Sequence, residues 1–226
     1  ALRRSRIANY DLRWEWFPGA DAVVAVSGFY KNFEDPIEVL VLPSTELIRS
    51  WVNAPEATNY GVELEMRSSL GIIAPALESL RFNGNLTLVE SEVASGGIST
   101  VFIPNQGPVD LQTIDRDRAL QGQSPYVLNL GLTWFSEGAG ASASLLFNRF
   151  GERIDAVGRE SSPDIYEEAR NQLDLVLERS FGAFKTKLSM NRLLGNDVTF
   201  TQGGEVLRQY DRGRSVSVSV SWTPVR

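Results

Sequence analysis

Apolar and polar residues alternate along most of this chain with a period of two. The last segment shows this most clearly, because the apolar residues from Val216 to Trp222 alternate with serines. Successive side chains of a β-strand point to opposite faces, so this period predicts strands with one apolar and one polar face. No segment has the periodicity of a long amphipathic helix. We predict about nine strands, at residues 3–17, 22–35, 57–69, 79–93, 119–135, 140–154, 168–180, 184–200 and 210–223.

The connections between these strands alternate between short and long. Tight turns are expected at 18–21, 137–139 and 181–183, whereas long loops are expected at 36–56 and 94–118. An antiparallel up-and-down sheet with short turns on one rim and long loops on the other produces this alternation. Outer-membrane barrels have the same asymmetry between periplasmic turns and external loops. The fold class predicted is all-β, an antiparallel up-and-down transmembrane β-barrel.

Aromatic residues gather at both ends of the predicted strands. Eight to twelve strand residues, at about 3.3 Å each and tilted by roughly 40°, span about 20–30 Å. This span matches the apolar band of about 25 Å in membrane barrels, which aromatic girdles flank at both interfaces. Tyr210 and Trp222 are expected on one face of a single strand. We predict an interfacial aromatic girdle made of Trp14, Trp16, Tyr60, Tyr126, Trp134, Tyr210 and Trp222.

The alternative is a soluble β-structure, where an apolar face would also alternate. Strands of 13–17 residues are long for a β-sandwich, where five or six is usual, and charges lie deep within the polar stripe. In a barrel, the apolar stripe meets lipid and the polar stripe faces a lumen. An odd number of strands, from the long-loop rim to the short-turn rim, indicates a C-terminal piece of a larger barrel. The candidates to face the lumen or a plug are Glu63, Glu65, Arg67, Asp174 and Glu178.

Composition excludes several classes of function. The chain has 226 residues, a formal net charge of −6, and neither Cys nor His. A disulfide scaffold is excluded, zinc sites lose their main ligands, and Ser-His-Asp and Cys-His catalysis lose their base. An acidic chain without basic blocks is a poor nucleic-acid binder. We therefore predict no enzyme and no catalytic, cofactor-binding or metal-binding residues.

One loop segment is a candidate for ligand contact. Residues 94–118 are rich in Gly, Ser, Asn, Gln and Asp, and end in Asp115, Arg116, Asp117 and Arg118. Long loops on a rigid scaffold are often functional. The alternative is a solvated loop with local ion pairs, which individually contribute little to stability.

Several segments resemble, in order, the C-terminal barrel of TonB-dependent outer-membrane receptors. They are residues 29–37 (FYKNFEDPI), 58–65 (TNYGVELE), 147–154 (FNRFGERI) and 191–197 (NRLLGND), followed by Gly213-Arg214 and the alternating last strand. The chain departs from the family at its end, where an aromatic residue is usual and Trp222 is followed by four more residues. The family's plug domain and TonB box lie upstream of the segments present here.

The resemblance implies that residues 1–226 are the C-terminal part of a barrel of roughly 22 strands. It implies energy-coupled uptake of a scarce ligand, such as a ferric siderophore, cobalamin or a glycan. The expected location is the outer membrane, with the C-terminus on the periplasmic side. The partners it implies are the lipid bilayer, a small-molecule or glycan ligand, and the TonB complex through the N-terminal part of the protein.

Three alternatives stay open at this point. The first is a passive porin-like channel, which would lack a plug. The second is a carbohydrate-uptake relative that works with a surface lipoprotein. The third is a soluble β-rich binding or adhesion domain.

Overall fold

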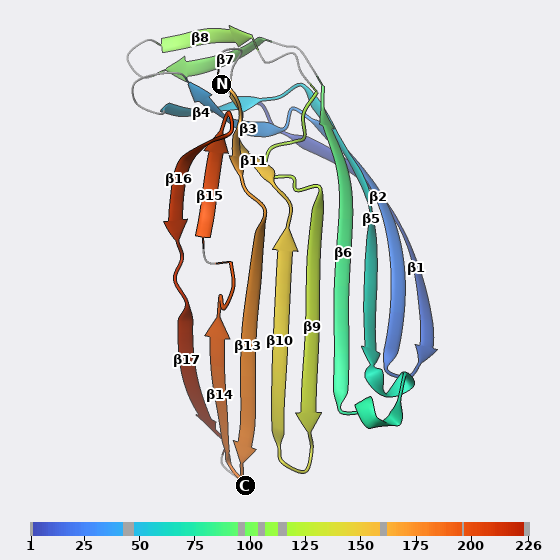
Figure 1. The fold of residues 1–226 in the computed structure, drawn as a ribbon. Coiled ribbons are helices and arrows are strands. Elements are labelled where there is room, and N and C mark those ends of the chain that lie inside the picture. The colour runs from blue at the N-terminus through green and yellow to red at the C-terminus, as the bar shows by residue number, and fades with distance from the viewer. Residues whose placement is uncertain are drawn as a thin grey trace.

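Nine long strands form one antiparallel sheet in the computed structural model of the chain (Figure 1). The structure describes residues 2–42, 48–94, 98–103, 107–112, 117–158, 162–195 and 197–223. Neighbouring strands of this sheet follow one another along the chain, from β1 at one edge to β17 at the other, which confirms the predicted up-and-down order. The strands are β1 (Arg6–Gly19), β2 (Ala22–Glu34), β5 (Glu56–Ser69), β6 (Leu80–Val93), β9 (Tyr126–Ser136), β10 (Ala141–Phe150), β13 (Arg170–Phe181), β14 (Phe184–Asn191) and β17 (Ser215–Trp222). We call this sheet the wall.

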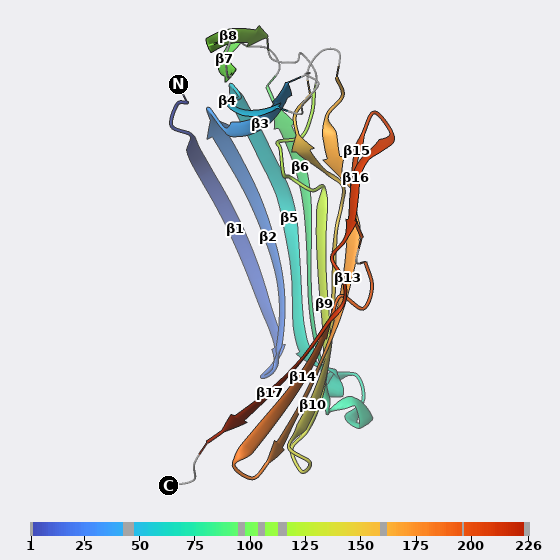
Figure 2. The same cartoon turned by 90° about the vertical axis from the view of Figure 1, so that its left-hand side faces the viewer.

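The two rims of the wall differ as predicted. At one rim, tight turns join β1 to β2, β9 to β10 and β13 to β14. Gly140 and Gly182 take φ values of 56° and 59° in two of these turns, which glycine adopts at little cost. Two short 3₁₀ turns, η1 (Leu70–Ile72) and η2 (Pro75–Leu77), join β5 to β6 at the same rim. Figure 2 shows the wall bending along its length, with the longer connections gathered above the other rim.

No helix among the described residues is long and apolar enough to cross a bilayer.

The long connections contain strands that the sequence analysis treated as loops. One hairpin pairs β3 (Ile37–Leu42) with β4 (Ile48–Asn53), and another pairs β7 (Ile98–Ile103) with β8 (Gly107–Gln112). A four-stranded sheet combines β11 (Arg153–Ala156), β12 (Ile165–Glu167), β15 (Asp197–Gln202) and β16 (Glu205–Asp211). These elements form a second layer above the wall, which we call the loop layer (Figure 1).

Four predicted strand bounds are wrong, because alternation continues where the chain leaves the wall. The predicted strand 119–135 has no strand structure before Tyr126, and 140–154 divides after Phe150. The predicted strand 184–200 ends at Asn191, before Arg192 with a φ of 59°. The predicted strand 210–223 divides around Gly213, with a φ of 67°. Strands of the loop layer also have a buried and an exposed face, so period two alone does not reveal the breaks.

Strand register builds a continuous apolar face on the wall. Residues directly opposite in antiparallel strands point to the same face. One such row crosses six strands through Phe82, Leu132, Leu145, Leu175, Met190 and Val216. Many large side chains of this face are exposed, with values of 80% for Leu12 and 66% for Val218, whereas Phe82, Leu175 and Met190 are half-buried. The opposite face carries the polar stripe.

The buried clusters lie in the loop layer and where β5 and β6 meet it, the latter formed by Ala54, Ala57 and Val93. One cluster joins Leu40 and Val52 of the first hairpin to Ile154 and Val157. A second joins Val41 to the four-stranded sheet through Ala156, Ile165, Val198 and Phe200. A soluble sheet protein buries one face of its main sheet, whereas this wall exposes an apolar face across nine strands.

Candidate functional site

The charged residues predicted to face a lumen share the polar face of the wall. Glu65 of β5 accepts a hydrogen bond from Arg13 of β1 across the intervening strand, with 2.8 Å between Nη2 and Oε2. Its other carboxylate oxygen lies 2.9 Å from Nε of Arg67. Glu63 is opposite Ser27 and Thr87 in the register. Glu65 is therefore held by two arginines of the wall.

The two predicted carboxylates of β13 are also held by the wall. Asp174 accepts hydrogen bonds from the backbone N–H of Arg192 at 2.7 Å and from Nε2 of Gln172 at 2.9 Å. Glu178 lies 2.8 Å from Nζ of Lys185 and 3.8 Å from Nζ of Lys187. Both carboxylates therefore have hydrogen-bond or ion-pair partners among the described residues. Whether they also touch a plug stays a prediction.

Sequence reasoning missed a neutral ladder on the same face. Asn148 donates to Oδ1 of Asn129 at 2.6 Å, and Asn129 donates to Oδ1 of Asn85 at 3.5 Å. The three residues lie far apart in the sequence and meet only through the register of β6, β9 and β10. The ladder makes this part of the polar face a hydrogen-bonding surface without net charge.

The ligand-contact candidates of the long loop have different surroundings. Asp115 and Arg116 lie outside the described residues, and Asp117 is exposed. Arg118 is nearly buried and pairs with Glu38 of β3, at 2.8 Å from Nη1 to Oε1 and 2.5 Å from Nη2 to Oε2. This pairing favours a structural role for Arg118. Sequence reasoning missed Glu38, because a single acid between apolar residues gives no sign of its partner.

A hollow of ≈ 320 Å³ lies beside this pair in the loop layer, lined by Asp117, Glu152 and Arg153 among others. Burial, repulsion by Glu168 and a hydrogen bond shared with Glu168 raise the pKa of the Glu152 carboxyl above its usual range. Thr201 donates to the Glu168 carboxylate at 2.7 Å. Two neighbouring carboxylates therefore share this part of the loop layer.

Replacing Glu152 with glutamine is expected to stabilise the loop layer at neutral pH. When the pKa of a carboxyl is raised in the folded state, its ionised form destabilises the fold. This cost is absent below the ordinary pKa, where the group is protonated in both states, and is complete above the raised pKa. The gain of Glu152→Gln should therefore be present at pH 7 and vanish below about pH 4. Limited proteolysis of the full-length protein across this pH range measures the gain, with Glu78→Gln at the other rim as the control. An equal gain at both ends of the range would contradict the expectation.

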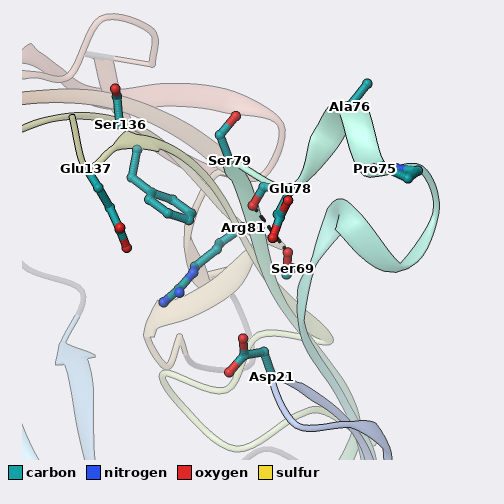
Figure 3. A pocket seen from close by; sticks show the side chains of 10 residues that line it. Asp21, Ser69, Pro75, Ala76, Glu78, Ser79, Arg81, Ser136 and Glu137 are labelled. Atoms are coloured by element: carbon teal, nitrogen blue, oxygen red, sulfur yellow. Dashed lines mark hydrogen bonds between the residues drawn. The ribbon is translucent and has the colours of Figure 1, made fainter. Parts of the chain in front are cut away.

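A larger hollow of ≈ 590 Å³ opens at the short-turn rim (Figure 3). Asp21, Glu78 and Glu137 come from three different turns and line it together with Arg81. The guanidinium of Arg81 lies over the Phe135 ring at 4.7 Å. Figure 3 shows the Ser69 hydroxyl donating to the Glu78 carbonyl, at 3.4 Å. The sequence showed no signal for this hollow, because only the pairing of the strands brings the three turns together.

Six of the seven predicted girdle residues lie on the wall. Trp14, Trp16, Trp134 and Trp222 are exposed near the short-turn rim, and Tyr60 and Tyr126 lie toward the loop layer. Tyr126 accepts a hydrogen bond from Nε of Arg149 at 2.9 Å. Tyr210 is on β16 in the loop layer and stacks on Phe200, with ring centroids 6.4 Å apart. Its predicted place in one strand with Trp222 is wrong, because the chain turns at Gly213; the girdle itself stays a prediction.

Comparison with solved structures shows a similar fold in an iron transporter and in two receptors for ferric compounds. The FrpB iron transporter from Neisseria meningitidis matches with a TM-score of 0.61, 11% identity, and coverage of 98% of this chain and 31% of that one. The ferric yersiniabactin uptake receptor FyuA from Yersinia pestis matches with a TM-score of 0.61, 16% identity, and coverage of 96% and 29%. A variant of the ferric enterobactin receptor PfeA from Pseudomonas aeruginosa matches with a TM-score of 0.59, 15% identity, and coverage of 97% and 31%.

These identities establish likeness of fold alone, and the chain spans about a third of the length of each solved protein. No curated protein sequence matches the chain. The profile of the family described as TonB dependent receptor-like, beta-barrel, matches residues 1–214. The nine-stranded wall, the short and long rims and this match agree, and the chain belongs to the TonB-dependent receptor-like β-barrel family.

Proposed function

We propose that this chain is the C-terminal part of the barrel of an outer-membrane receptor that takes up a scarce ligand by energy-coupled transport. The observation that carries the proposal is the exposed apolar face, which continues across all nine strands of the wall. Contact with lipid makes such a face favourable, whereas the same area left in water is an aggregation hazard. Membership of the receptor family supports the same function.

The two faces of the wall then have separate roles. The apolar face contacts the hydrocarbon of the bilayer, and the polar face with its ion pairs lines the lumen or contacts a plug. The loop layer stands on the outer side, and the short-turn rim with the C-terminus lies on the periplasmic side. The loop layer has its own buried clusters, so it presents a structured surface to a ligand rather than a set of separate loops.

The ligand we propose is an iron chelate of the siderophore class, with cobalamin or a glycan as alternatives. The three solved proteins with a similar wall are described as an iron transporter and two ferric-siderophore receptors. Coupling to the TonB complex would run through the N-terminal part of the full protein. A surface lipoprotein partner belongs to the glycan alternative.

Site-directed spin labelling tests where the two faces lie. Single cysteines placed in turn from Tyr126 to Trp134 of the full-length protein carry a nitroxide, which is unambiguous because the chain has no cysteine. We expect even positions to collide with oxygen, which enriches in lipid, and odd positions to collide with a water-soluble nickel complex. If even positions were shielded from both reagents, the wall would be the core of a soluble protein and the membrane assignment would fall.

Removal of the energy-coupling protein tests active transport. Uptake of a radioactive iron chelate by cells that produce the full-length receptor is expected to fall to background in the deletion strain. Undiminished uptake in that strain would instead support a passive porin-like channel. A receptor variant that is produced at the same level but lacks the loop layer controls for nonspecific leakage.

A further inference from the structure

A hollow of ≈ 440 Å³ opens on the apolar face of the wall, and we call it the apolar groove. It lies across β1, β2 and β5, which run side by side in Figure 2. Its centre is Gly28 of β2, and Leu12 and Val62 lie directly opposite Gly28 on the two neighbouring strands. A Cβ added at Gly28 would meet no atom within 4 Å. The groove is therefore a gap in the apolar surface that no side chain of the described residues fills.

Three tyrosines form the edge of the groove toward the loop layer. Tyr10, Tyr30 and Tyr60 are directly opposite one another in the register, and all three side chains are exposed. The ring centroids of Tyr10 and Tyr30 lie 6.5 Å apart. Tyrosine combines an apolar ring with a hydroxyl that prefers polar surroundings, so a row of tyrosines at one level marks the end of the apolar band. The groove lies on the apolar side of that boundary.

Two carboxylates lie beside the tyrosine row on the same face. Glu90 of β6 is directly opposite Tyr60, and Glu92 is directly opposite Thr58, one pair closer to the loop layer. Directly opposite residues share a face, with Cβ atoms about 5 Å apart. Both acids are exposed, and neither has an ion-pair partner within the part of the chain that the structure describes.

This end of the face carries more negative than positive charge. Glu34 of β2 and Glu56 of β5 are opposite each other, and Arg6 of β1 is opposite Glu34. Arg6 lies 3.7 Å from the Glu34 carboxylate, and both side chains are exposed. Among the described residues of these strands and β6, this end of the face thus has four carboxylates and one guanidinium.

The groove and the carboxylates define a ligand with an apolar chain and a cationic head. Pockets of about 300–1,000 Å³ hold small molecules, so the groove has room for a stretch of one acyl chain. An excess of carboxylates favours a cationic group over an anionic one. A primary ammonium carries three N–H donors for carboxylates and hydroxyls, whereas a quaternary ammonium has none.

We propose that the apolar groove binds one acyl chain of a phospholipid whose headgroup carries a primary ammonium, as in phosphatidylethanolamine. This inference rests on the proposed place of the wall in a bilayer, and adds a specific lipid to it. The chain lies over Gly28, the tyrosine hydroxyls donate to the phosphate and ester oxygens, and the ammonium donates to Glu90 and Glu92. Such a lipid stays with the protein when bulk lipid is removed.

Native mass spectrometry of the full-length receptor in detergent tests this lipid. The protein is delipidated and mixed with equal amounts of phosphatidylethanolamine, phosphatidylcholine and phosphatidylglycerol with acyl chains of the same length. We expect the wild type to retain one molecule of phosphatidylethanolamine in preference to the other two lipids. Gly28→Leu fills the groove without a clash and should weaken this retention by about tenfold, because the side chain displaces methylene groups of the lipid.

The matched control for the groove is Ala143→Leu. Ala143 is opposite Trp134 on the same face, two strand pairings away from β5, so it receives the same side chain outside the groove. This variant should retain phosphatidylethanolamine as the wild type does.

A second variant tests the headgroup. Glu90→Gln with Glu92→Gln should lower the preference for phosphatidylethanolamine over phosphatidylcholine by about fivefold, because two exposed charge pairs are lost. Glu78→Gln at the short-turn rim removes one carboxylate far from the groove and should leave the preference unchanged.

The outcomes separate this inference from the proposed function. Equal retention of the three lipids, a preference for phosphatidylglycerol, unchanged retention in Gly28→Leu, or an unchanged preference in the glutamine double variant would each overturn the inference. If spin labels place the wall in lipid but no phosphatidylethanolamine is retained, only this inference falls. If even positions are shielded from oxygen, the membrane assignment falls and the lipid site falls with it.

Discussion

Replacing Glu38 with alanine is expected to destabilise the loop layer by about 3–5 kcal/mol, the usual cost of breaking a buried ion pair from one side. The Glu38 side chain is 1% exposed and that of Arg118 is 11% exposed. Removal of the carboxylate leaves the guanidinium of Arg118 in a nearly dry site with a single remaining backbone acceptor, the carbonyl of Ala119 at 3.2 Å. The backbone N–H of Gln121 also loses its acceptor, Oε1 of Glu38 at 3.1 Å.

This effect should spread through the loop layer, because the same residues connect three segments. The Gln121 side chain accepts from the backbone N–H of Val39 at 2.6 Å and donates to the carbonyl of Asp155. The backbone of Val157 bonds that of Val41 and Val39 at 2.9 Å each. Loss of the Glu38 contact therefore frees both the first hairpin and β11.

Hydrogen exchange of the full-length receptor measures the loss at the amides of Val41 and Val157. We expect their exchange to accelerate by roughly a hundredfold or more in Glu38→Ala, with exchange in the wall unchanged. The control is Glu34→Ala, which breaks an exposed pair with Arg6 at 3.7 Å and should change little. A double variant with Met at Glu38 and Arg118 should recover much of the protection, because apolar residues can replace a buried pair. Equal exchange rates in Glu38→Ala and Glu34→Ala would show that the buried ion pair stabilises the loop layer no more than an exposed pair does.

Alanine in place of Gly61 is expected to destabilise the wall by about 1–3 kcal/mol. A Cβ at this position would lie 2.2 Å from the backbone oxygen of Leu88 on the paired strand, and 2.7 Å from Cζ of Phe29. The phenyl ring can move, but the backbone oxygen belongs to the β5–β6 ladder and moves only if the pairing distorts. Gly61 is thus required by the close approach of two backbones.

Gly84→Ala is the matched control, since it changes the same residue type on the neighbouring strand. A Cβ there would meet only side-chain atoms, Cζ of Phe82 at 2.8 Å and Cδ2 of Leu130 at 3.4 Å. The Phe82 ring can rotate aside, so a much smaller cost is expected. Urea unfolding of the full-length barrel in detergent, followed by its heat-modifiable gel mobility, compares the two variants. Equal midpoints for Gly61→Ala and Gly84→Ala would contradict the role given to the Leu88 oxygen.

The order of the wall strands and the face of each residue were determined by the sequence alone, because these rules are local. Alternation assigns each residue to a face without knowledge of its neighbours, as the run from Val216 to Trp222 shows. Turn residues at 18–21 and 181–183 set the short rim, and the long intervals set the other. Lipid on one side and polar groups on the other then require the same period in every strand.

The loop layer was decided by the tertiary structure, because its contacts join residues far apart in the chain. Period two runs on past Phe150 and Asn191, so only the pairing of β11, β12, β15 and β16 with one another ends the wall strands. The break at Arg192 is set by a side-chain contact, in which its Nε donates to the Gly213 carbonyl at 2.6 Å.

For the candidate sites too, the sequence determined the face of a residue, and the tertiary structure decided which residues lie together. The sequence alone placed Glu65 and Glu178 on the polar face, because a face assignment needs only the period of the strand. Glu38 and Arg118 pair across 80 residues, and Asn85, Asn129 and Asn148 meet only through the register of three strands. Such side-chain contacts depend on which strands pair and in which register. Register is set by the packing of the whole fold rather than by local preference.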